Sequence, residues 1–335
     1  MTEPELTRLL HTAAPELVLR HSAGGVDLRA SVDLVGGGLR ALTLGRMDLV
    51  EPYPVGQAPP HRAGAILFPW PNRVRDGLWT QHGVSHQLRR NEVDLGNAAH
   101  GLVGSNVFAV EAQALSSATV STVIEPQPGY PFQVRLEVTY RLTDDGLDVS
   151  HQITNESMWP APVALGQHPY IRVGDVPTAD LTVLVDADTC FQTDGHLIPV
   201  SELPVDGSPA DLRNGRQVCE LDVNTCYGNL HLTDGRNRHR VCAPDGRGVE
   251  VWTSPDFGFV QIYTCSIFPR ESGEGLGLAV EPMTAPADAL NSGRGLNWLE
   301  PSACWTLSWG IRPIAITNGF GNIKGLQLAT LKLAD

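Results

Sequence analysis

"FQVRLEVTYRLTDDGLDVSHQITN", residues 132–155, is the stretch that decides the fold class. In residues 132–140 every second side chain is apolar and those between are polar. This period of two is typical of a β-strand with one buried and one wet face. The TDDG turn joins it to residues 147–155, which alternate again, so the stretch predicts an antiparallel hairpin. His151 falls on the apolar face, and we interpret it as a core or interface histidine rather than a catalytic one.

Strand-like patterns recur along the chain, at residues 26–50, 181–187, 248–254, 259–268, 275–281 and 304–313. The 34 glycines and 25 prolines are spread along the sequence, which favours many short strands joined by tight turns. The only convincing helical pattern covers residues 4–11. We therefore predict a large antiparallel all-β sandwich.

No linker divides the 335 residues, so we expect a single domain over residues 1–313, with a short extension at its N-terminus. Residues 314–335 do not continue the preceding pattern. They are expected to form a tail or a packed extension.

The composition excludes several classes of partner. A net charge of −13 argues against nucleic acid and anionic membranes as ligands. No run approaches the ~20 apolar residues that span a bilayer, and the N-terminus lacks a signal-peptide pattern, which predicts a cytoplasmic protein. The 6 cysteines form no C-x-x-C motif, so we expect reduced thiols and no zinc or redox centre.

Two segments combine polar side chains with residues that interrupt strands. In AGAILFPWPNRVRDGLWTQHG (63–83), neither proline of the Pro-Trp-Pro-Asn-Arg run can donate to a strand ladder. We predict a rigid loop that presents Trp70, Asn72 and Arg73, with Trp70 as an apolar platform for a ligand. In NAAHGLVGSNVF, the glycine after His100 would let the backbone approach a ligand closely. A loop-locking arginine and a solvent-exposed turn histidine are the alternatives.

Two strand-like segments end in the same unusual way. In ALGQHPYIRVG (164–174), two small residues lie on the same strand face as His168, which is followed by proline. In GLGLAVEPMTAPADALNSGRGLNWLEP (275–301), two small residues share a face with Glu281, which is also followed by proline. We expect a hollow over these small residues, so that two such strands in a concave sheet line a cavity with an acid–base pair. The alternatives are a core histidine and a carboxylate that pairs with a buried arginine.

In this order, FPWPNRVRDGLW, NAAHGLV, GQHPY and AVEPMTAPADALNSGRGL resemble the aldose 1-epimerase (galactose mutarotase) family. The resemblance covers roughly residues 20–313. It implies a galactose mutarotase-like β-supersandwich that needs no metal or organic cofactor. It also implies interconversion of the α and β anomers of a free sugar, by a monomer or homodimer that binds a small-molecule sugar.

The resemblance assigns roles to individual residues. It implies Glu281 as general base, His168 as general acid, His100 as a second histidine near the ring oxygen and Arg73 as a sugar-contacting arginine. Ring opening takes a proton from the anomeric hydroxyl and gives one to the ring oxygen, so the base must be ionised while the acid is protonated. Three further residues within the motifs are expected to bind substrate, namely Asn72, Trp70 and Tyr170.

The family's hydroxyl-binding aspartate has no direct match. Spacing back from Tyr227 in LDVNTCYGNL places Asn224 in its position, with Asp222 two residues earlier. An asparagine holds a hydroxyl less strongly than a carboxylate does. Either the substrate differs, or a local shift brings Asp222 into the site.

Three other functions fit parts of the sequence. A sugar sensor on the same fold would bind without catalysis, and the neutral Asn224 leaves this open. A phosphosugar epimerase needs a cationic pocket, for which Arg73, Arg75 and Arg172 are candidates. A glycoside-processing enzyme needs a second carboxylate near Glu281, and Asp288 is the nearest in sequence.

Overall fold

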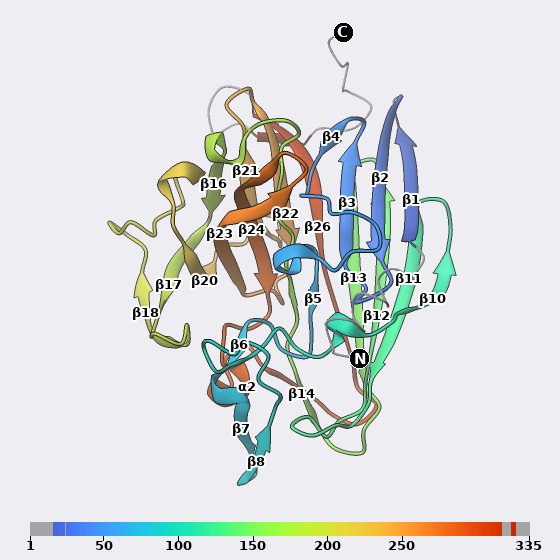
Figure 1. Ribbon diagram of the computed structural model, residues 1–335, viewed down its shortest axis with the longest axis vertical. Coiled ribbons are helices and arrows are strands. Elements are labelled where there is room, and N and C mark those ends of the chain that lie inside the picture. The colour runs from blue at the N-terminus through green and yellow to red at the C-terminus, as the bar shows by residue number, and fades with distance from the viewer. Residues whose placement is uncertain (1–15, 24, 317–322, 326–335) are drawn as a thin grey trace.

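A computed structural model describes residues 16–23, 25–316 and 323–325 of the chain. These residues form antiparallel strands with very little helix, as the sequence predicts. The fold is a large β-supersandwich, in which two large sheets face each other and a four-stranded sheet flanks them (Figure 1). The predicted helix at residues 4–11 lies outside the described residues.

The larger sheet has ten strands and contains the hairpin predicted from residues 132–155. In order across the sheet, its strands are β10 (Ala109–Gln113), β11 (Ser117–Ile124), β12 (Val134–Thr143), β13 (Gly146–Asn155), β26 (Cys304–Ile316), β22 (Arg247–Thr253), β21 (Asn237–Cys242), β16 (Thr182–Val185) and β19 (Arg216–Gln217), with β27 (Ile323–Gly325) paired to β26. His151 is buried in β13, as expected for a core histidine.

The second sheet has seven strands and carries the two segments that end in His168 and Glu281. Its order is β18 (Pro199–Pro204), β17 (Ala187–Thr193), β20 (Asn224–Leu230), β23 (Phe259–Arg270), β24 (Gly273–Met283), β15 (Gly166–Gln167) and β5 (Ile66–Leu67). The flanking sheet contains β1 (Glu16–Ala23), β2 (Val26–Asp33), β3 (Leu39–Leu44) and β4 (Met47–Asp48).

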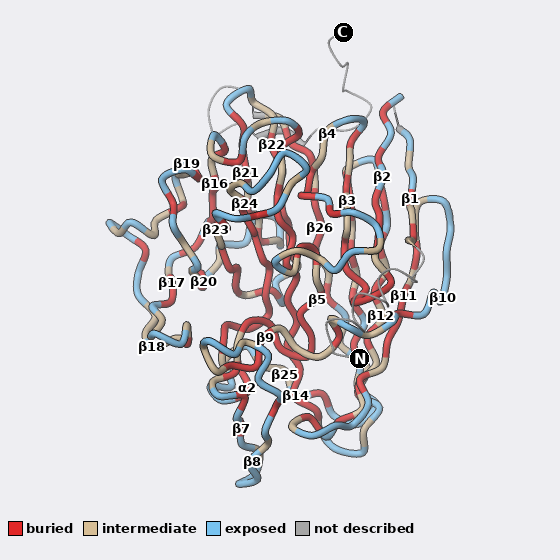
Figure 2. Tube along the Cα trace, viewed as in Figure 1, coloured by how far each residue is buried: buried red, intermediate tan, exposed pale blue. Residues whose placement is uncertain are grey.

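The main hydrophobic core lies between the two large sheets, where Figure 2 shows the buried trace. Val260 and Ile262 of β23 and Val280 of β24 point into this core. Because side chains alternate along a strand, Gln261 and Glu281 project from the opposite face. The seven-stranded sheet therefore has one face for the core and one for the site.

Two strand predictions differ from the structure in their limits. Residues 181–187 do not form one strand, because the chain leaves the ten-stranded sheet after β16 and enters the seven-stranded sheet at β17. Strand β26 continues to Ile316, three residues past the domain limit predicted at residue 313. The backbone of β27 pairs with it.

The small elements hold loops at one end of the sandwich. They are three two-stranded pairs, β6 (Arg73–Val74) with β9 (Ala98–Ala99), β7 (Leu78–Gln81) with β8 (Val84–Gln87) and β14 (Ala161–Val163) with β25 (Asn297–Leu299), and the short helix α2 (Ala289–Ser292). Within the described residues, we find no helix with the length and apolar character needed to cross a membrane.

Candidate active site

The strand register brings His168 and Glu281 together. Glu281 of β24 lies opposite Gln261 of β23. On the other side of β24, Gly166 pairs with Met283, and Tyr170 forms an isolated bridge with Ala279. His168 lies midway between these two contacts and therefore next to Glu281. The two segments with matching endings are neighbours in one sheet, as expected.

The two ionisable groups are in direct contact. Nε2 of His168 lies 3.4 Å from Oε1 of Glu281, and their side chains are only 6% and 3% exposed. Burial raises the pKa of Glu281 to about 8, although the nearby positive charge of Arg73 opposes this. Burial likewise lowers the pKa of His168 to about 3, and the positive charge of Arg62 adds to the effect.

These shifts differ from the charge distribution expected from the sequence. Taking either charge out of water is costly, so in the free protein the proton resides on Glu281 and His168 is neutral. Between the two pKa values the pair nevertheless holds one proton in total. An ionised glutamate beside a protonated histidine also holds one proton, so the pair carries the number that acid–base ring opening needs.

His100 lies on the other side of His168. The two rings meet edge to face, with their centroids 5.8 Å apart and their planes at 70° to each other. The backbone N–H of His100 donates to the carbonyl oxygen of Asn72 at 2.7 Å, which ties the two sequence motifs together. Burial and the charge of Arg62 hold the pKa of His100 well below its usual range, so this imidazole is neutral.

Gly101 follows His100 and was predicted to let the backbone approach a ligand closely. The structure shows a close approach to another part of the chain instead. A Cβ on Gly101 would lie 2.0 Å from the carbonyl oxygen of Phe68, and its φ is +73°. The close approach is therefore to the backbone of the FPWPN loop. His100 itself has a φ of 64°, an uncommon conformation for a residue with a side chain.

A chain of hydrogen-bonded polar side chains runs from Glu92 to Asn224. Glu92 accepts three hydrogen bonds from Arg73, the shortest at 2.7 Å, and Arg73 also donates to Oδ1 of Asn72 at 3.0 Å. Asn72 donates to Gln261 at 3.3 Å, and Gln261 donates to Oδ1 of Asn224 at 2.7 Å. Arg73 therefore holds its loop, as the loop-locking alternative predicts, and its contact with a sugar stays a prediction.

The structure separates the two candidates for the aspartate position. Asn224 begins β20 and joins the polar chain through Gln261. Asp222, in the segment before β20, and Asn224 are both exposed, but Asn224 is the one that the structure shows hydrogen-bonded to Gln261. Asn224 is therefore the candidate that contacts this polar chain, and its binding of a sugar hydroxyl stays a prediction.

Two expectations about the packing around the site are wrong. Trp70 is not presented to a ligand, because its ring is buried in the main core near Tyr130. The small residues do not leave a hollow either. Pro71 covers Gly166 and Phe268 covers Gly277, each at less than 3 Å from where a Cβ would be. The small residues accommodate neighbouring side chains instead of leaving space.

Tyr170, expected to bind substrate, is buried behind His168. Its ring stacks on the imidazole with centroids 5.3 Å apart and packs on Phe268 at 4.5 Å. This contact fixes the plane of the catalytic candidate. Tyr170 is therefore placed to position His168.

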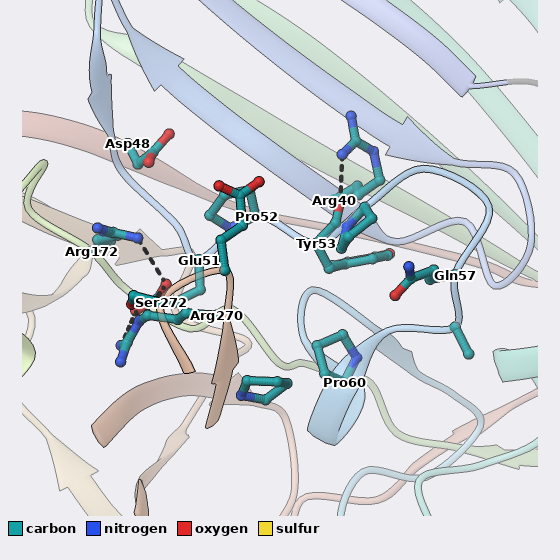
Figure 3. A pocket seen from close by; sticks show the side chains of 14 residues that line it. Arg40, Asp48, Glu51, Pro52, Tyr53, Gln57, Pro60, Arg172, Arg270 and Ser272 are labelled. Carbon is teal, nitrogen blue, oxygen red and sulfur yellow. Dashed lines mark hydrogen bonds and ion pairs between the residues drawn. The ribbon is translucent and has the colours of Figure 1, made fainter. Parts of the chain in front are cut away.

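A hollow of about 830 Å³ is lined by residues of the flanking sheet, such as Arg40, and by Arg172 and Arg270 (Figure 3). Arg172 and Arg270 converge there on Glu51, whose side chain is 1% exposed. Arg172, one of the arginines considered for a phosphate site, is thus already paired, at 3.3 Å. The other two candidates are also paired, Arg73 with Glu92 and Arg75 with Asp194.

Two site residues were missed by sequence reasoning. Gln261 is a polar residue within the otherwise apolar start of the predicted strand at 259–268, and this could have drawn attention to it. Glu92 lies in the loop before β9, where no local pattern distinguishes it from a surface glutamate. Its partnership with Arg73 is a tertiary contact.

Comparison with known proteins identifies the family. The family model described as aldose 1-epimerase matches residues 19–312. An uncharacterised protein of Escherichia coli K12, YihR, is 29% identical over 276 residues, which cover 82% of this chain and 86% of that protein.

Solved structures show the same fold. A GalM/aldose epimerase homologue from Caenorhabditis elegans has a TM-score of 0.79 and 19% identity, covering 91% of this chain and 100% of that one. A galactose mutarotase-like protein from Clostridium acetobutylicum has a TM-score of 0.77 and 16% identity, covering 91% and 99%. Since the family match spans every strand that holds His168, Glu281 and their partners, the chain belongs to the aldose 1-epimerase family.

Proposed function

We propose that the protein interconverts the α and β anomers of a free aldose by acid–base ring opening and closing. The observation that carries this proposal is the contact of 3.4 Å between Glu281 and His168. The anomeric oxygen and the ring oxygen of a sugar are bonded to the same carbon, C1. An acid and a base that act on these two atoms must therefore lie close together, as this pair does.

The two residues of the pair account for both proton transfers of the reaction. With sugar bound, Glu281 as carboxylate takes the proton of the anomeric hydroxyl while His168 as imidazolium gives one to the ring oxygen. The C1–ring oxygen bond breaks and an open-chain aldehyde forms. After rotation about the C1–C2 bond, Glu281 returns its proton to the carbonyl oxygen and His168 recovers its own, so the ring closes as the other anomer.

The remaining polar groups are suited to bind the sugar. Hydroxyls can accept from Arg73 and exchange hydrogen bonds with the amides of Asn72, Gln261 and Asn224. Nδ1 of His100 is buried and has no hydrogen-bond partner among the described residues. A neutral imidazole there can serve the ring oxygen or an adjacent hydroxyl.

The alternatives receive less support from the geometry. Asp288 accepts hydrogen bonds from the backbone N–H of Arg75 at 3.0 Å and from Asn291 at 2.8 Å, so it braces the loop instead of pairing with Glu281. For a phosphosugar epimerase, the three arginines considered at first are all neutralised. A sugar sensor would not need an acid in contact with a base.

Polarimetry with freshly dissolved α-D-glucose and α-D-galactose tests the proposal. We expect the protein to accelerate mutarotation, and Glu281→Gln and His168→Ala each to lower kcat by about 10²–10⁴-fold. Both variants should retain the melting behaviour of a folded protein. Near-normal turnover in either variant contradicts the assignment, and binding of sugar without acceleration by the wild type supports a sensor.

A further inference from the structure

The hollow of about 830 Å³ is distinct from the proposed active site. Its lining includes neither His168 nor Glu281, nor any residue of the hydrogen-bonded polar chain. Tyr53, which does line it, is buried in one cluster with Tyr170, and the ring of Tyr170 stacks on His168. Buried aromatic rings thus lie between the hollow and the proposed acid.

Ion pairs fix the base of this hollow (Figure 3). Glu51, whose side chain is 1% exposed, accepts hydrogen bonds from Arg270 at 3.1 Å and from Arg172 at 3.3 Å. Arg270 also donates to the carbonyl oxygen of Leu276 at 2.7 Å. Arg172 likewise donates to that of Gly174 at 2.8 Å. Because each guanidinium is bound to both a carboxylate and the backbone, we expect the base to keep its shape without a ligand.

Prolines stiffen the rim of the hollow. Pro52, Pro54 and Pro60 belong to the loop between β4 and β5, and Pro269 belongs to β23. Proline fixes the backbone φ angle, so this rim loses little conformational freedom when a ligand binds. The volume also falls within the range of about 300–1,000 Å³ that is typical of small-molecule sites. The hollow is therefore preformed and large enough for a sugar.

The arginines of the hollow are already neutralised. Arg40 pairs with Glu16, and Arg172 and Arg270 share Glu51. An anionic ligand would have to compete with these carboxylates for their partners, and a bound cation would be repelled by the guanidinium groups. The pairing therefore favours an uncharged ligand.

Asp48, the last residue of β4, provides a hydrogen-bond acceptor in the lining. It is half-buried, and in the described part of the chain no side chain donates a hydrogen bond to its carboxylate, although the charge of Arg172 acts on it. Burial raises the pKa of Asp48, because the carboxylate loses contact with water. A ligand that donates hydrogen bonds to this carboxylate would stabilise its ionised form.

Neutral polar groups complete the lining. Gln57 contributes an amide and Ser272 a hydroxyl, and Figure 3 shows Asp48 and Gln57 on opposite sides of the hollow. Amides and hydroxyls both donate and accept hydrogen bonds, as the hydroxyls of a sugar do. The proline rings add apolar surface for the C–H groups of a sugar ring. This combination suits a molecule that is uncharged and rich in hydroxyls.

We propose that the hollow is a second sugar site, which binds a neutral sugar without catalysing a reaction on it. Asp48 accepts hydrogen bonds from hydroxyls of the sugar, while Gln57 and Ser272 exchange hydrogen bonds with others. The inference goes beyond the proposed function and does not depend on it, since binding here needs neither Glu281 nor His168.

Methyl NMR of protein labelled at its alanines, titrated with D-glucose and with D-galactose, observes the two sites separately. The methyl group of Ala58 belongs to the lining of the hollow, and that of Ala99 directly precedes His100. We expect Ala58 to report a dissociation constant of its own. Asp48→Asn should raise that constant by about 10-fold, the difference between a hydrogen bond to a charged group and one to a neutral group. The constant reported by Ala99 should not change.

Two further variants keep the test interpretable. Gln57→Trp fills the hollow and should abolish the response of Ala58 to sugar. Asp234→Asn removes an exposed aspartate from the turn between β20 and β21 and should leave both titrations unchanged. The inference is overturned if Ala58 responds to neither sugar, or if its titration coincides with that of Ala99 and is unaffected by Asp48→Asn.

Failure of the proposed function can be recognised separately. If the wild type does not accelerate mutarotation, the proposed activity is wrong, and a response of Ala58 that Asp48→Asn weakens still supports the second site. If the wild type accelerates mutarotation while Ala58 stays unchanged, only the second site is overturned. Asp48→Asn and Gln57→Trp should both keep the mutarotation rate of the wild type.

Discussion

Glu281 and His168 differ from ordinary glutamates and histidines because they are buried against one another. Burial favours the neutral form of each, yet the pair keeps one proton between a pKa of about 3 and one of about 8. Reaction needs that proton to be available to the ring oxygen while the anomeric oxygen gives one up. The pair therefore has a working range of pH instead of a single working value.

The alkaline side of that range is accessible to experiment. We expect kcat/KM to be level near neutral pH and to fall as pH rises through about 8, because the pair then loses the proton that ring opening delivers. A series of rates between pH 5.5 and about 9.5, corrected for uncatalysed mutarotation, measures this. A rate that stays level throughout the alkaline range contradicts the proposed sharing of one proton.

Sequence reasoning located this pair through the wrong physical cause. The repeated order of small residues, ionisable residue and proline occurs in both segments, although β24 continues past Glu281 to Met283, and strand register then brings the two segments together. The expected hollow is filled by Pro71 and Phe268, which no local pattern reveals. Glu92 was missed for a related reason, since its importance depends on the charge of Arg73 that lies near it in space.

At the scale of elements, the alternation of apolar and polar residues was sufficient to predict most strands. It did not show which sheet each strand joins. The hairpin of β12 and β13 is local, and its turn could be read directly from TDDG. The change of sheet between β16 and β17 could not, because a single residue, Asp186, separates the two strands. Pairing of β6 with β9, which joins Arg73 to the His100 segment, is likewise a tertiary event.

The contact between the FPWPN loop and the His100 segment is expected to be sensitive to a single methyl group. Gly101→Ala places a Cβ 2.0 Å from the carbonyl oxygen of Phe68 at a positive φ, so we expect a loss of about 2–5 kcal/mol in the free energy of unfolding. Turnover should fall as well, because His100 moves with the loop. Chemical denaturation and mutarotation rates measure the two effects.

Gly45→Ala is the matched control for that substitution. Gly45 also has a positive φ, of +58°, but nothing lies within 4 Å of its Cβ position. Only the conformational penalty of about 1–2 kcal/mol remains there. If the two variants lose the same stability, the close contact with Phe68 has no energetic importance.

At the scale of the whole molecule, the two large sheets are joined by a polar contact just behind the site. Nε2 of His151, on β13, lies 3.0 Å from Nε2 of Gln167, on β15, and both side chains are buried. Gln167 directly precedes His168 in the chain. The ten-stranded sheet thereby supports the strand that presents the proposed acid.

Removing one partner of this contact leaves the other buried and unpaired. We expect His151→Leu and Gln167→Leu each to lower the free energy of unfolding by about 1–3 kcal/mol, and the double variant to lose less than the sum. Urea denaturation of all four proteins gives the coupling energy. Additive losses would show that the two side chains act independently.

Successive residues at β15 point to opposite faces of the sheet, and this has a consequence for how such proteins diverge in evolution. Gln167 faces the core and His168 faces the site, so inserting or deleting one residue in β15 would exchange a core amide for the proposed acid. A substitution leaves the alternation of core-facing and site-facing positions unchanged, and solved structures at 16% and 19% identity keep the fold. We therefore expect evolution to conserve the length of β15 more strictly than its composition, and insertions to accumulate in turns such as that between β7 and β8.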